Sequence, residues 1–338
     1  MNEKFQNACH RKPQATPPIW MMRQAGRYHR HYQALRAQHS FMDLCKIPEL
    51  AAQVALGPVA DFDFDVSILF SDLLFPLEAL GMGLEYTDQG PRLGFSLSEA
   101  NLAKLSPLSE ALPQLQFQHQ AMKLTRELLP KDKSLIGFVG GPWTLYVYAV
   151  EGSHAGQLLV AKNSPLLWQG FLKHLEPLLI QNIELQFAGG AEVVMIFDTA
   201  AGELSPQQWQ TWVVPSLRRL AERFPNRLGY YSKGTQSSHL SGEFCQLPWA
   251  GLGFDHRWSL AQSFGLGKGF VQGNFDQALL HHEPSRFKAV LSEWLLPLRD
   301  RPLAERAGWV CGLGHGVLPK TPEQNVRAFV QLVREVCK

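Results

Sequence analysis

Eight short apolar runs alternate with longer amphipathic stretches, and this alternation constrains the fold of the chain more than any other feature. The runs end in polar or glycine-rich residues. The predicted strands are Ile19–Arg23, Val66–Asp72, Leu135–Gly141, Glu192–Thr199, Arg227–Lys233, Gly251–Phe254, Gly269–Asn274 and Gly308–His315. The predicted helices between and after them are Glu49–Val59, Phe75–Gly81, Leu167–Ala188, Pro206–Arg223, Ser285–Leu296 and Pro322–Val336.

This alternation predicts an α/β fold, a (β/α)8 or TIM barrel. Continuous apolar runs such as 193–197 are typical of parallel strands that are buried on both faces. A doubly wound open sheet is the main alternative, but such sheets usually carry a GxGxxG turn after the first strand, and no predicted strand is followed by one. A chain of 338 residues fits two domains or one large barrel. We expect residues 1–338 to form a single barrel domain with an N-terminal extension.

Composition excludes several classes of function. With 45% hydrophobic and 18% charged residues, the chain is globular and can bury a sizeable core. Its net charge is only +2 and its basic residues are scattered, which argues against a nucleic-acid partner. The sequence contains no apolar stretch of membrane-spanning length and no apolar segment of a secretion signal near its start, so we expect a cytoplasmic protein without a membrane partner. Five widely spaced cysteines and the lack of CxxC, HxC or HExxH patterns argue against a disulfide frame and a metal site.

The clearest candidate site follows the first predicted strand. Arg23, Gln24, Ala25, Gly26 and Arg27 place two arginines four residues apart, with small residues between them. Guanidinium groups are permanently charged and suit bidentate binding of carboxylates or phosphates. Glycine lets the backbone pass close to a ligand. The alternative is a surface turn whose arginines face solvent.

Other strand ends carry further polar candidates, and active sites of barrels lie at these carboxyl ends. Asp72 closes an apolar run, where a carboxylate is costly to bury unless it meets donors or a positive charge. It could equally cap the following helix. His315 lies between glycines that leave its ring accessible, although an isolated histidine is often structural. Tyr148 and Thr199 follow two other strands, and a core tyrosine and a helix cap are their alternative roles.

Six motifs, in order, resemble the uroporphyrinogen decarboxylase family. The segments are MMRQAGRY, FDVSILFSDLL, GFVGGPWTL, IFDTAAGELSP, QGNFD and GLGHGVLPKTP, and the resemblance runs from about Pro17 to the C-terminus. It implies a cytoplasmic homodimeric (β/α)8 barrel enzyme that needs no cofactor and no metal. Its tetrapyrrole substrate would be uroporphyrinogen III, whose four acetate groups lose their carboxyl groups to leave methyl groups, giving coproporphyrinogen III.

The resemblance also implies roles for the candidate residues. Arg23 through Arg27 match the substrate-binding segment of the family, and Asp72 matches its central carboxylate, the stabiliser of the transition state. Tyr148, Thr199 and His315 match positions that contact the substrate, where we expect them to act as orienting donors.

The sequence departs from the family pattern at several positions. The substitutions are His29-Arg30-His31 for Leu-Pro-Glu, Ala200 for Trp, Gln277 for Pro, Gly312 for Asn, and Gly253-Phe254 for an Asp-Trp pair unless Asp255 replaces the aspartate in a shifted register. The first of these is expected to add positive charge beside the arginines. We expect the reaction centre to be intact and loop geometry to differ.

Two other functions fit parts of the pattern. A related barrel methyltransferase that depends on a cobamide needs a thiolate-rich zinc site, which the lack of HxC spacing disfavours. A non-catalytic tetrapyrrole carrier would need the arginines but not Asp72, so the presence of that carboxylate favours an enzyme.

Overall fold

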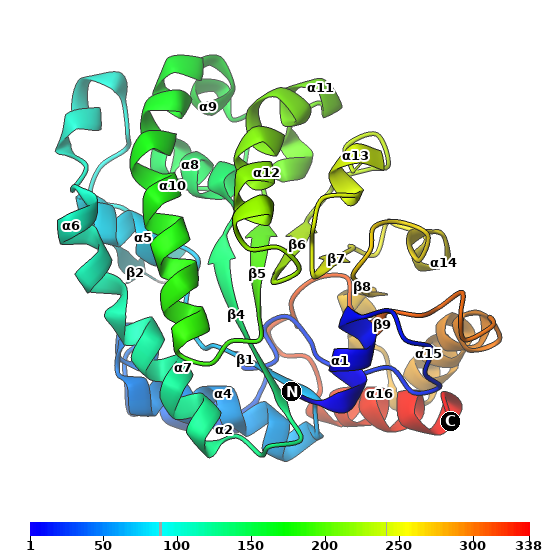
Figure 1. Ribbon diagram of the computed structural model, residues 1–338. Coiled ribbons are helices and arrows are strands. Elements are labelled where there is room, and N and C mark those ends of the chain that lie inside the picture. The colour runs from blue at the N-terminus through cyan, green and yellow to red at the C-terminus, as the bar shows by residue number, and fades with distance from the viewer. Residues whose placement is uncertain (88–89, 241) are drawn as a thin grey trace.

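The computed structural model describes residues 1–87, 90–240 and 242–338. Within them, one seven-stranded sheet forms the centre of the molecule, and all neighbouring strands in it are parallel. In spatial order its strands are β1 (Val66–Ile68), β4 (Ser134–Gly140), β5 (Val193–Asp198), β6 (Leu228–Ser232), β7 (Gly251–Gly253), β8 (Phe270–Phe275) and β9 (Trp309–Leu313). The order across the sheet follows the order along the chain, and the sheet curls in one direction (Figure 1).

Seven of the eight predicted strands are confirmed, but the prediction of a strand at Ile19–Arg23 is wrong. Ile19 forms one isolated parallel bridge with Cys311 of β9, and its carbonyl accepts the N–H of Asp65, which precedes β1, at 3.0 Å. Beyond it, the Met21 N–H donates to the side chain of Gln24 and the Met21 carbonyl accepts the Gln24 N–H. The backbone therefore turns before a ladder can form.

A small hairpin, β2 (Glu85–Thr87) with β3 (Gly90–Arg92), lies outside the main sheet and was not predicted. It belongs to the long connection between β1 and β4. The rest of that connection is helical: α5 (Phe75–Leu77), η1 (Glu78–Met82), η2 (Glu99–Lys104), α6 (Leu108–Ala111), η3 (Leu112–Leu115) and α7 (Gln116–Leu128).

Long helices cover the outside of the sheet (Figure 1). Helix α4 packs on β1 and α7, α10 packs on β4 and β5, and α15 packs on α16. These helices are α4 (Pro48–Phe62), α10 (Pro165–Ala188), α12 (Val214–Arg223), α15 (Pro284–Arg299) and α16 (Glu323–Val336). All six predicted helices are confirmed, with 75–81 divided between α5 and η1 and 206–223 divided among α11 (Pro206–Gln208), η5 (Trp209–Val213) and α12.

Shorter helices fill the remaining connections. They are α2 (Arg30–Arg36), α3 (Phe41–Lys46), α8 (Pro142–Glu151), α9 (Leu159–Asn163), η4 (Ala201–Glu203), α13 (Gly242–Cys245), α14 (Leu260–Ser263) and η6 (Gln277–His281). In the part of the chain that the structure describes, no helix has the length and apolar character needed to cross a membrane.

The expected N-terminal extension is helix α1 (Glu3–Cys9), which packs against β8 and β9. Its Phe5 is buried in the core cluster inside the curled sheet and contacts Phe270, with ring centroids 5.7 Å apart. The Asn2 side chain caps the helix by accepting the Phe5 N–H, and the Asn2 N–H donates to the Ser134 hydroxyl at 2.8 Å. Helix α1 therefore closes the amino-terminal end of the sheet.

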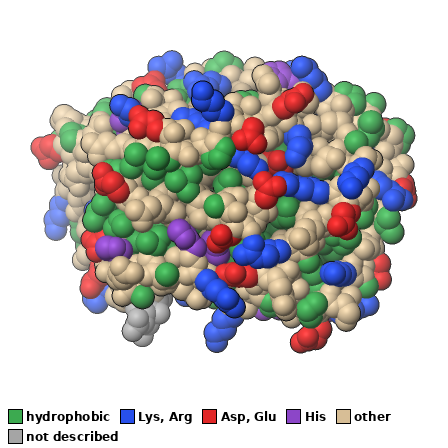
Figure 2. Space-filling view, turned by 90° about the horizontal axis from the view of Figure 1, so that it is seen from below, with side chains coloured by type: hydrophobic (Ala, Val, Ile, Leu, Met, Phe, Trp, Pro, Cys, Tyr) green, Lys and Arg blue, Asp and Glu red, His purple; other side chains and the backbone are tan. Residues whose placement is uncertain are grey.

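The surface at this end carries charges of both signs between apolar side chains (Figure 2). At this end of the sheet Asp63 forms ion pairs with Lys133 and Arg334, and Lys4 pairs with the buried Asp65. This mixture agrees with the scatter of basic residues along the sequence.

We expect Phe5→Ala to lower the free energy of unfolding by about 3 to 5 kcal/mol, because it leaves a cavity under β8. Chemical denaturation measures the change, and Gln6→Ala, at an exposed position of the same helix, is the matched control. A loss below about 1 kcal/mol would show that α1 contributes little to the closure.

Candidate active site

A cavity of about 680 Å³ opens where the strands end at their carboxyl termini. Nearly all of the residues expected from the sequence line it: Arg23, Gln24, Ala25, Gly26, Arg27, Asp72, Thr199 and His315. Tyr148 is not among the lining residues. Side chains from distant parts of the chain therefore meet in one place, as the parallel arrangement requires.

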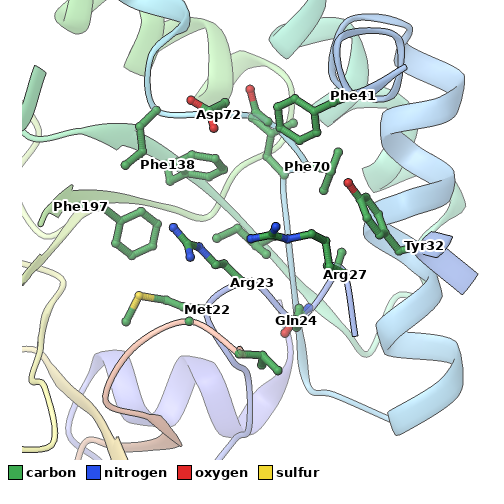
Figure 3. Close-up of a pocket in the computed structure, with 18 of the residues that line it drawn as sticks. Met22, Arg23, Gln24, Arg27, Tyr32, Phe41, Phe70, Asp72, Phe138 and Phe197 are labelled. Carbon is green, nitrogen blue, oxygen red and sulfur yellow. The ribbon is translucent and has the colours of Figure 1, made fainter. Parts of the chain in front are cut away.

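Arg23 and Arg27 extend into this cavity from the same turn (Figure 3). Both side chains are exposed. Across residues 1–87, 90–240 and 242–338, neither guanidinium forms a hydrogen bond or an ion pair. The cavity thus holds two cations without a bonded counter-ion, an arrangement suited to an anion from outside.

Gln24 shapes the turn that carries the arginines. Its side chain is buried, accepts the Met21 N–H at 3.2 Å and donates to the carbonyl of Val66 at 3.0 Å. Both ends of the amide are therefore used within the protein. Gln24 thereby fixes the position of Arg23 relative to β1.

Asp72 lies across the cavity from the arginines, beside Phe70 and Phe138 (Figure 3). One carboxylate oxygen accepts the N–H of Leu74 at 2.9 Å. Burial raises the pKa of Asp72, while the nearby Tyr86 hydroxyl, the Leu74 N–H and the charge of Arg23 act in the lowering direction. Any added donor or positive charge would therefore stabilise the carboxylate of Asp72 further.

His315 is the imidazole of the cavity. Its Nδ1 lies 3.0 Å from the hydroxyl of Tyr231, and the two rings are stacked. Burial, followed by the charges of Arg23 and Lys233, lowers the pKa of His315 to about 4. The ring is therefore neutral at physiological pH.

The two predicted hydroxyls are placed differently. The hydroxyl of Thr199 makes no hydrogen bond within the described residues, so it is available to a ligand. The hydroxyl of Tyr148 lies 2.9 Å from Nδ1 of His154. Burial raises the pKa of Tyr148, the charge of Asp72 acts in the same direction and Arg23 opposes it. Tyr148 is thus within electrostatic reach of Asp72 and Arg23 but does not line the cavity.

Sequence reasoning missed the aromatic wall and a third arginine. The cavity is also lined by Tyr32, Arg36, Phe41, Phe70, Tyr86, Phe138 and Phe197. Phe138 and Phe197 lie inside strands and read as ordinary core residues in the sequence. Arg36 follows Tyr32 by one helical turn in α2, a spacing that places both on one face and was the available signal.

Asp198 is a second carboxylate that the sequence did not single out. It is fully buried at the end of β5 and accepts hydrogen bonds from the Thr144 hydroxyl at 2.6 Å, the Thr144 N–H at 3.2 Å and the Tyr230 hydroxyl at 3.2 Å. A Cβ on Gly141 would lie 2.6 Å from Cγ of Asp198, so only glycine permits this approach. Asp198 thereby joins the start of α8 to the end of β5, next to Thr199.

Burial raises the pKa of Asp198 to about 6, although the Thr144 and Tyr230 hydrogen bonds lower it. The folded protein therefore binds more protons at this group than the unfolded chain does between about pH 4 and 6. Its contribution to the free energy of unfolding falls as the pH rises through that window.

Most of the departures from the family pattern have a structural context, and the structure does not explain Gln277. A Cβ on Gly312 would collide with the carbonyl of Trp20, and one on Gly253 would lie 2.8 Å from Oε1 of Gln272. Both backbone polar groups of Ala200 form hydrogen bonds. Its N–H donates to the Thr144 hydroxyl, and its carbonyl accepts Nε1–H of Trp143. Asp255 is buried, and its carboxylate accepts from the Gly234 N–H and from Arg257, so it has a role in joining loops.

The segment His29–His31 adds less charge to the site than expected. His29 is buried, with Nε2 2.7 Å from Asp61, and burial lowers its pKa despite that carboxylate. The ring of His31 packs on Gly57, with Nε2 2.9 Å from the carbonyl of Gln53. The histidines therefore anchor α2, and Arg30 is the permanent cation among the three.

Comparison with known proteins agrees with the site. The family model of uroporphyrinogen decarboxylase matches residues 1–336. A uroporphyrinogen decarboxylase from Chloroflexus aurantiacus is 34% identical over 99% of this chain and 96% of that protein. One from Pelobacter propionicus is 33% identical over the full length of both.

Among solved structures, a methyltransferase from Methanosarcina mazei is similar with a TM-score of 0.77, covering 98% of this chain and 97% of the other. Because the sequence identity is only 20%, this similarity shows a shared fold and nothing about activity.

The fold and cavity define an α/β protein that presents cations and one desolvated carboxylate at the carboxyl ends of a curled parallel sheet. The chain belongs to the uroporphyrinogen decarboxylase family.

For Asp198→Asn we expect a flatter dependence of stability on pH. The shift of about two pKa units corresponds to about 3 kcal/mol, which the wild-type protein loses between pH 4 and 6.5 and the variant keeps. Denaturant unfolding at several pH values measures it. Asp132→Asn, at an exposed carboxylate, should retain the wild-type slope, and parallel curves for all three proteins would contradict the role of Asp198.

Proposed function

We propose that this protein is a carboxy-lyase that converts uroporphyrinogen III to coproporphyrinogen III in tetrapyrrole biosynthesis. Family membership over nearly the whole chain supports this reaction. The observation that carries the proposal is the pairing of two free arginines with a desolvated Asp72 in a large aromatic cavity.

Each part of the cavity matches a part of this substrate. A porphyrinogen is large and has apolar faces, carboxylates at its rim and pyrrole N–H groups directed inward. Phe70, Phe138 and Phe197 supply an apolar wall. Arg23 and Arg27 bind the rim carboxylates, and Asp72 accepts the central N–H groups. A phosphate ligand would use the arginines but would be repelled by Asp72.

Asp72 stabilises the charge that develops during the reaction. Loss of carbon dioxide from an acetate needs an electron sink, which a pyrrole ring protonated on carbon provides. At about 4 Å and an effective dielectric constant near 20, the carboxylate stabilises such a cation by about 4 kcal/mol. If this stabilisation is confined to the transition state, it accelerates the reaction about a thousandfold. Because burial destabilises the carboxylate, it gains more when the cation forms beside it.

The arginines act as clamps rather than acids. With a pKa above about 12, a guanidinium is a poor general acid. Arg23, packed next to Gly316, and Arg27 on the same turn hold carboxylates in a fixed orientation. Thr199 and His315 contact the substrate, and Tyr148 supports the site through the contact of its hydroxyl with His154.

The remaining expectations concern architecture. We propose that 1–338 is one domain and that the segment around Ile19 supplies the eighth strand position of a closed barrel. The bridge of Ile19 to β9 and its hydrogen bond to Asp65 support this closure. The homodimer and the cytoplasmic location stay predictions, and size-exclusion chromatography with light scattering tests the first.

Anaerobic incubation with uroporphyrinogen III tests the activity. Chromatography of the oxidised products should show successive loss of carboxyl groups until the tetracarboxylate remains. An unchanged octacarboxylate, beside an active control decarboxylase, would overturn the proposal.

For Asp72→Asn we expect kcat to fall about a thousandfold while stability is unchanged or higher, because the variant removes a poorly solvated charge but keeps an acceptor for the Leu74 N–H. Steady-state kinetics and thermal unfolding measure the two effects. Asp132→Asn serves again as control and should keep full activity. Near-normal turnover of Asp72→Asn would remove this residue from the mechanism.

Arg23→Ala and Arg27→Ala should each lower kcat/KM about 10- to 100-fold, the usual effect of losing a hydrogen bond to a charged group. The melting temperature should stay constant, since neither side chain has a partner within the described protein. Arg286→Ala, at an exposed position on α15, is the control. A fall in melting temperature for the two cavity variants alone would assign the arginines a structural role instead.

A further inference from the structure

The hydrogen bonds around Tyr231 fix the direction of its hydroxyl proton. Tyr231 is fully buried in β6, and its oxygen lies 2.8 Å from the carbonyl of Gly314 and 3.0 Å from Nδ1 of His315. A carbonyl accepts hydrogen bonds and never donates them. The single hydroxyl proton must therefore lie toward Gly314, because otherwise two oxygen lone pairs would face each other at 2.8 Å.

The hydrogen bonds of Tyr231 also determine which nitrogen of the His315 imidazole carries the proton. With its own proton directed to Gly314, the Tyr231 oxygen can only accept from His315, so Nδ1 carries hydrogen. A neutral imidazole carries one proton, and Nε2 then holds a lone pair. His315 lines the cavity, and its Nε2 forms no hydrogen bond with the described residues.

We propose that Tyr231 is a positioning residue that holds His315 as the Nδ1–H tautomer, so that Nε2 presents a hydrogen-bond acceptor to the cavity. Its ligand there is an N–H group of the porphyrinogen and not a carboxylate. The choice of substrate group at Nε2 rests on the proposed function, whereas the assignment of the tautomer does not. The donor role expected for His315 from the sequence would require the opposite tautomer or a protonated ring.

The charges around His315 keep Nε2 unprotonated. Besides burial, Arg23, Lys233 and His154 lower the pKa of His315, and Asp255 alone among the charged neighbours raises it. Tyr231 itself stays neutral, because burial and the charge of Asp255 raise its pKa far above the physiological range. A carboxylate placed at Nε2 would set lone pairs against each other, while the free guanidinium of Arg23 lies near. The site thereby directs an N–H group of the substrate to Nε2 of His315 and a carboxylate to Arg23.

Nitrogen-15 NMR of histidine-labelled, ligand-free protein tests the tautomer. At pH 7 we expect His315 to show a protonated Nδ1 and an unprotonated Nε2. His239 is an internal reference for the Nε2–H tautomer, because its Nδ1 accepts the Gln236 N–H and its Nε2 donates to the carbonyl of Leu204. A His315 signal of the same tautomer as His239, or a doubly protonated ring, would overturn the proposal.

Two adjacent tyrosines make a matched pair of variants. Tyr231→Phe should shift His315 toward the Nε2–H tautomer, which free histidine prefers, and leave the His239 signals in place. Tyr230→Phe removes an equally buried hydroxyl that binds Asp198, and should leave the His315 tautomer unchanged. Equal effects of both variants on His315 would assign the result to general loosening of β6 and overturn the role of Tyr231. If Tyr231→Phe does not fold, the wild-type spectrum decides.

Titration of the wild-type protein with coproporphyrinogen III under anaerobic conditions tests the choice of ligand group. Binding should move the Nε2 resonance as expected for an acceptor that receives a hydrogen bond, with the ring still neutral. Conversion of His315 to the doubly protonated form on binding would show carboxylate recognition and overturn the acceptor role.

Kinetics separate this inference from the proposed function. Tyr231→Phe should lower kcat/KM about three- to tenfold, as expected for one neutral hydrogen bond. Absence of decarboxylation by the wild-type protein would overturn the proposed function and the choice of ligand group, while the tautomer is decided by the ligand-free spectrum. Unchanged kcat/KM in a variant with the altered tautomer would overturn the contact between Nε2 and substrate.

Discussion

All strands of the main sheet run in one direction, and the site depends on this constraint. Parallel strands bring their carboxyl ends to one edge, so Asp72, Thr199 and His315 meet although they are far apart in sequence. The hydrogen bonds of Asp198 then fix α8 to the end of β5, and Gln24 fixes the arginine turn to β1. The buried polar contacts of Asp198 and Gln24 therefore position the elements that carry the polar groups of the cavity.

The cavity keeps its cations and its carboxylate apart. Burial raises the pKa of Asp72, and within the described residues Arg23 and Arg27 have no bonded counter-ion. An internal salt bridge between them would have to be broken by each substrate. Separation of the cations from the carboxylate avoids this competition. The arginines can then bind the rim of a macrocycle while Asp72 stabilises the charge at its centre.

The sequence predicted the order of strands and most of the site because both depend on local patterns. Apolar runs mark β4, β5 and β9, and the polar residues that end them mark the cavity. It failed at Ile19–Arg23, where the Gln24 side chain replaces strand partners. It also did not indicate that the Tyr148 hydroxyl contacts His154 and that Tyr148 is absent from the cavity lining. Tyr86 was missed because only three-dimensional packing brings the hairpin to the cavity, whereas Arg36 was missed although its spacing from Tyr32 in α2 places the two on one helix face. The tautomer of His315 depends on one carbonyl that no sequence pattern identifies.

The absence of bonded counter-ions for Arg23 and Arg27 within the described residues also has a consequence for the ligand-free molecule in solution. Two exposed cations at the mouth of an apolar cavity behave as a small anion exchanger. Because both guanidinium groups are exposed, dissolved salt screens their attraction for a carboxylate-bearing ligand. Apparent affinity is then a property of the buffer as much as of the protein.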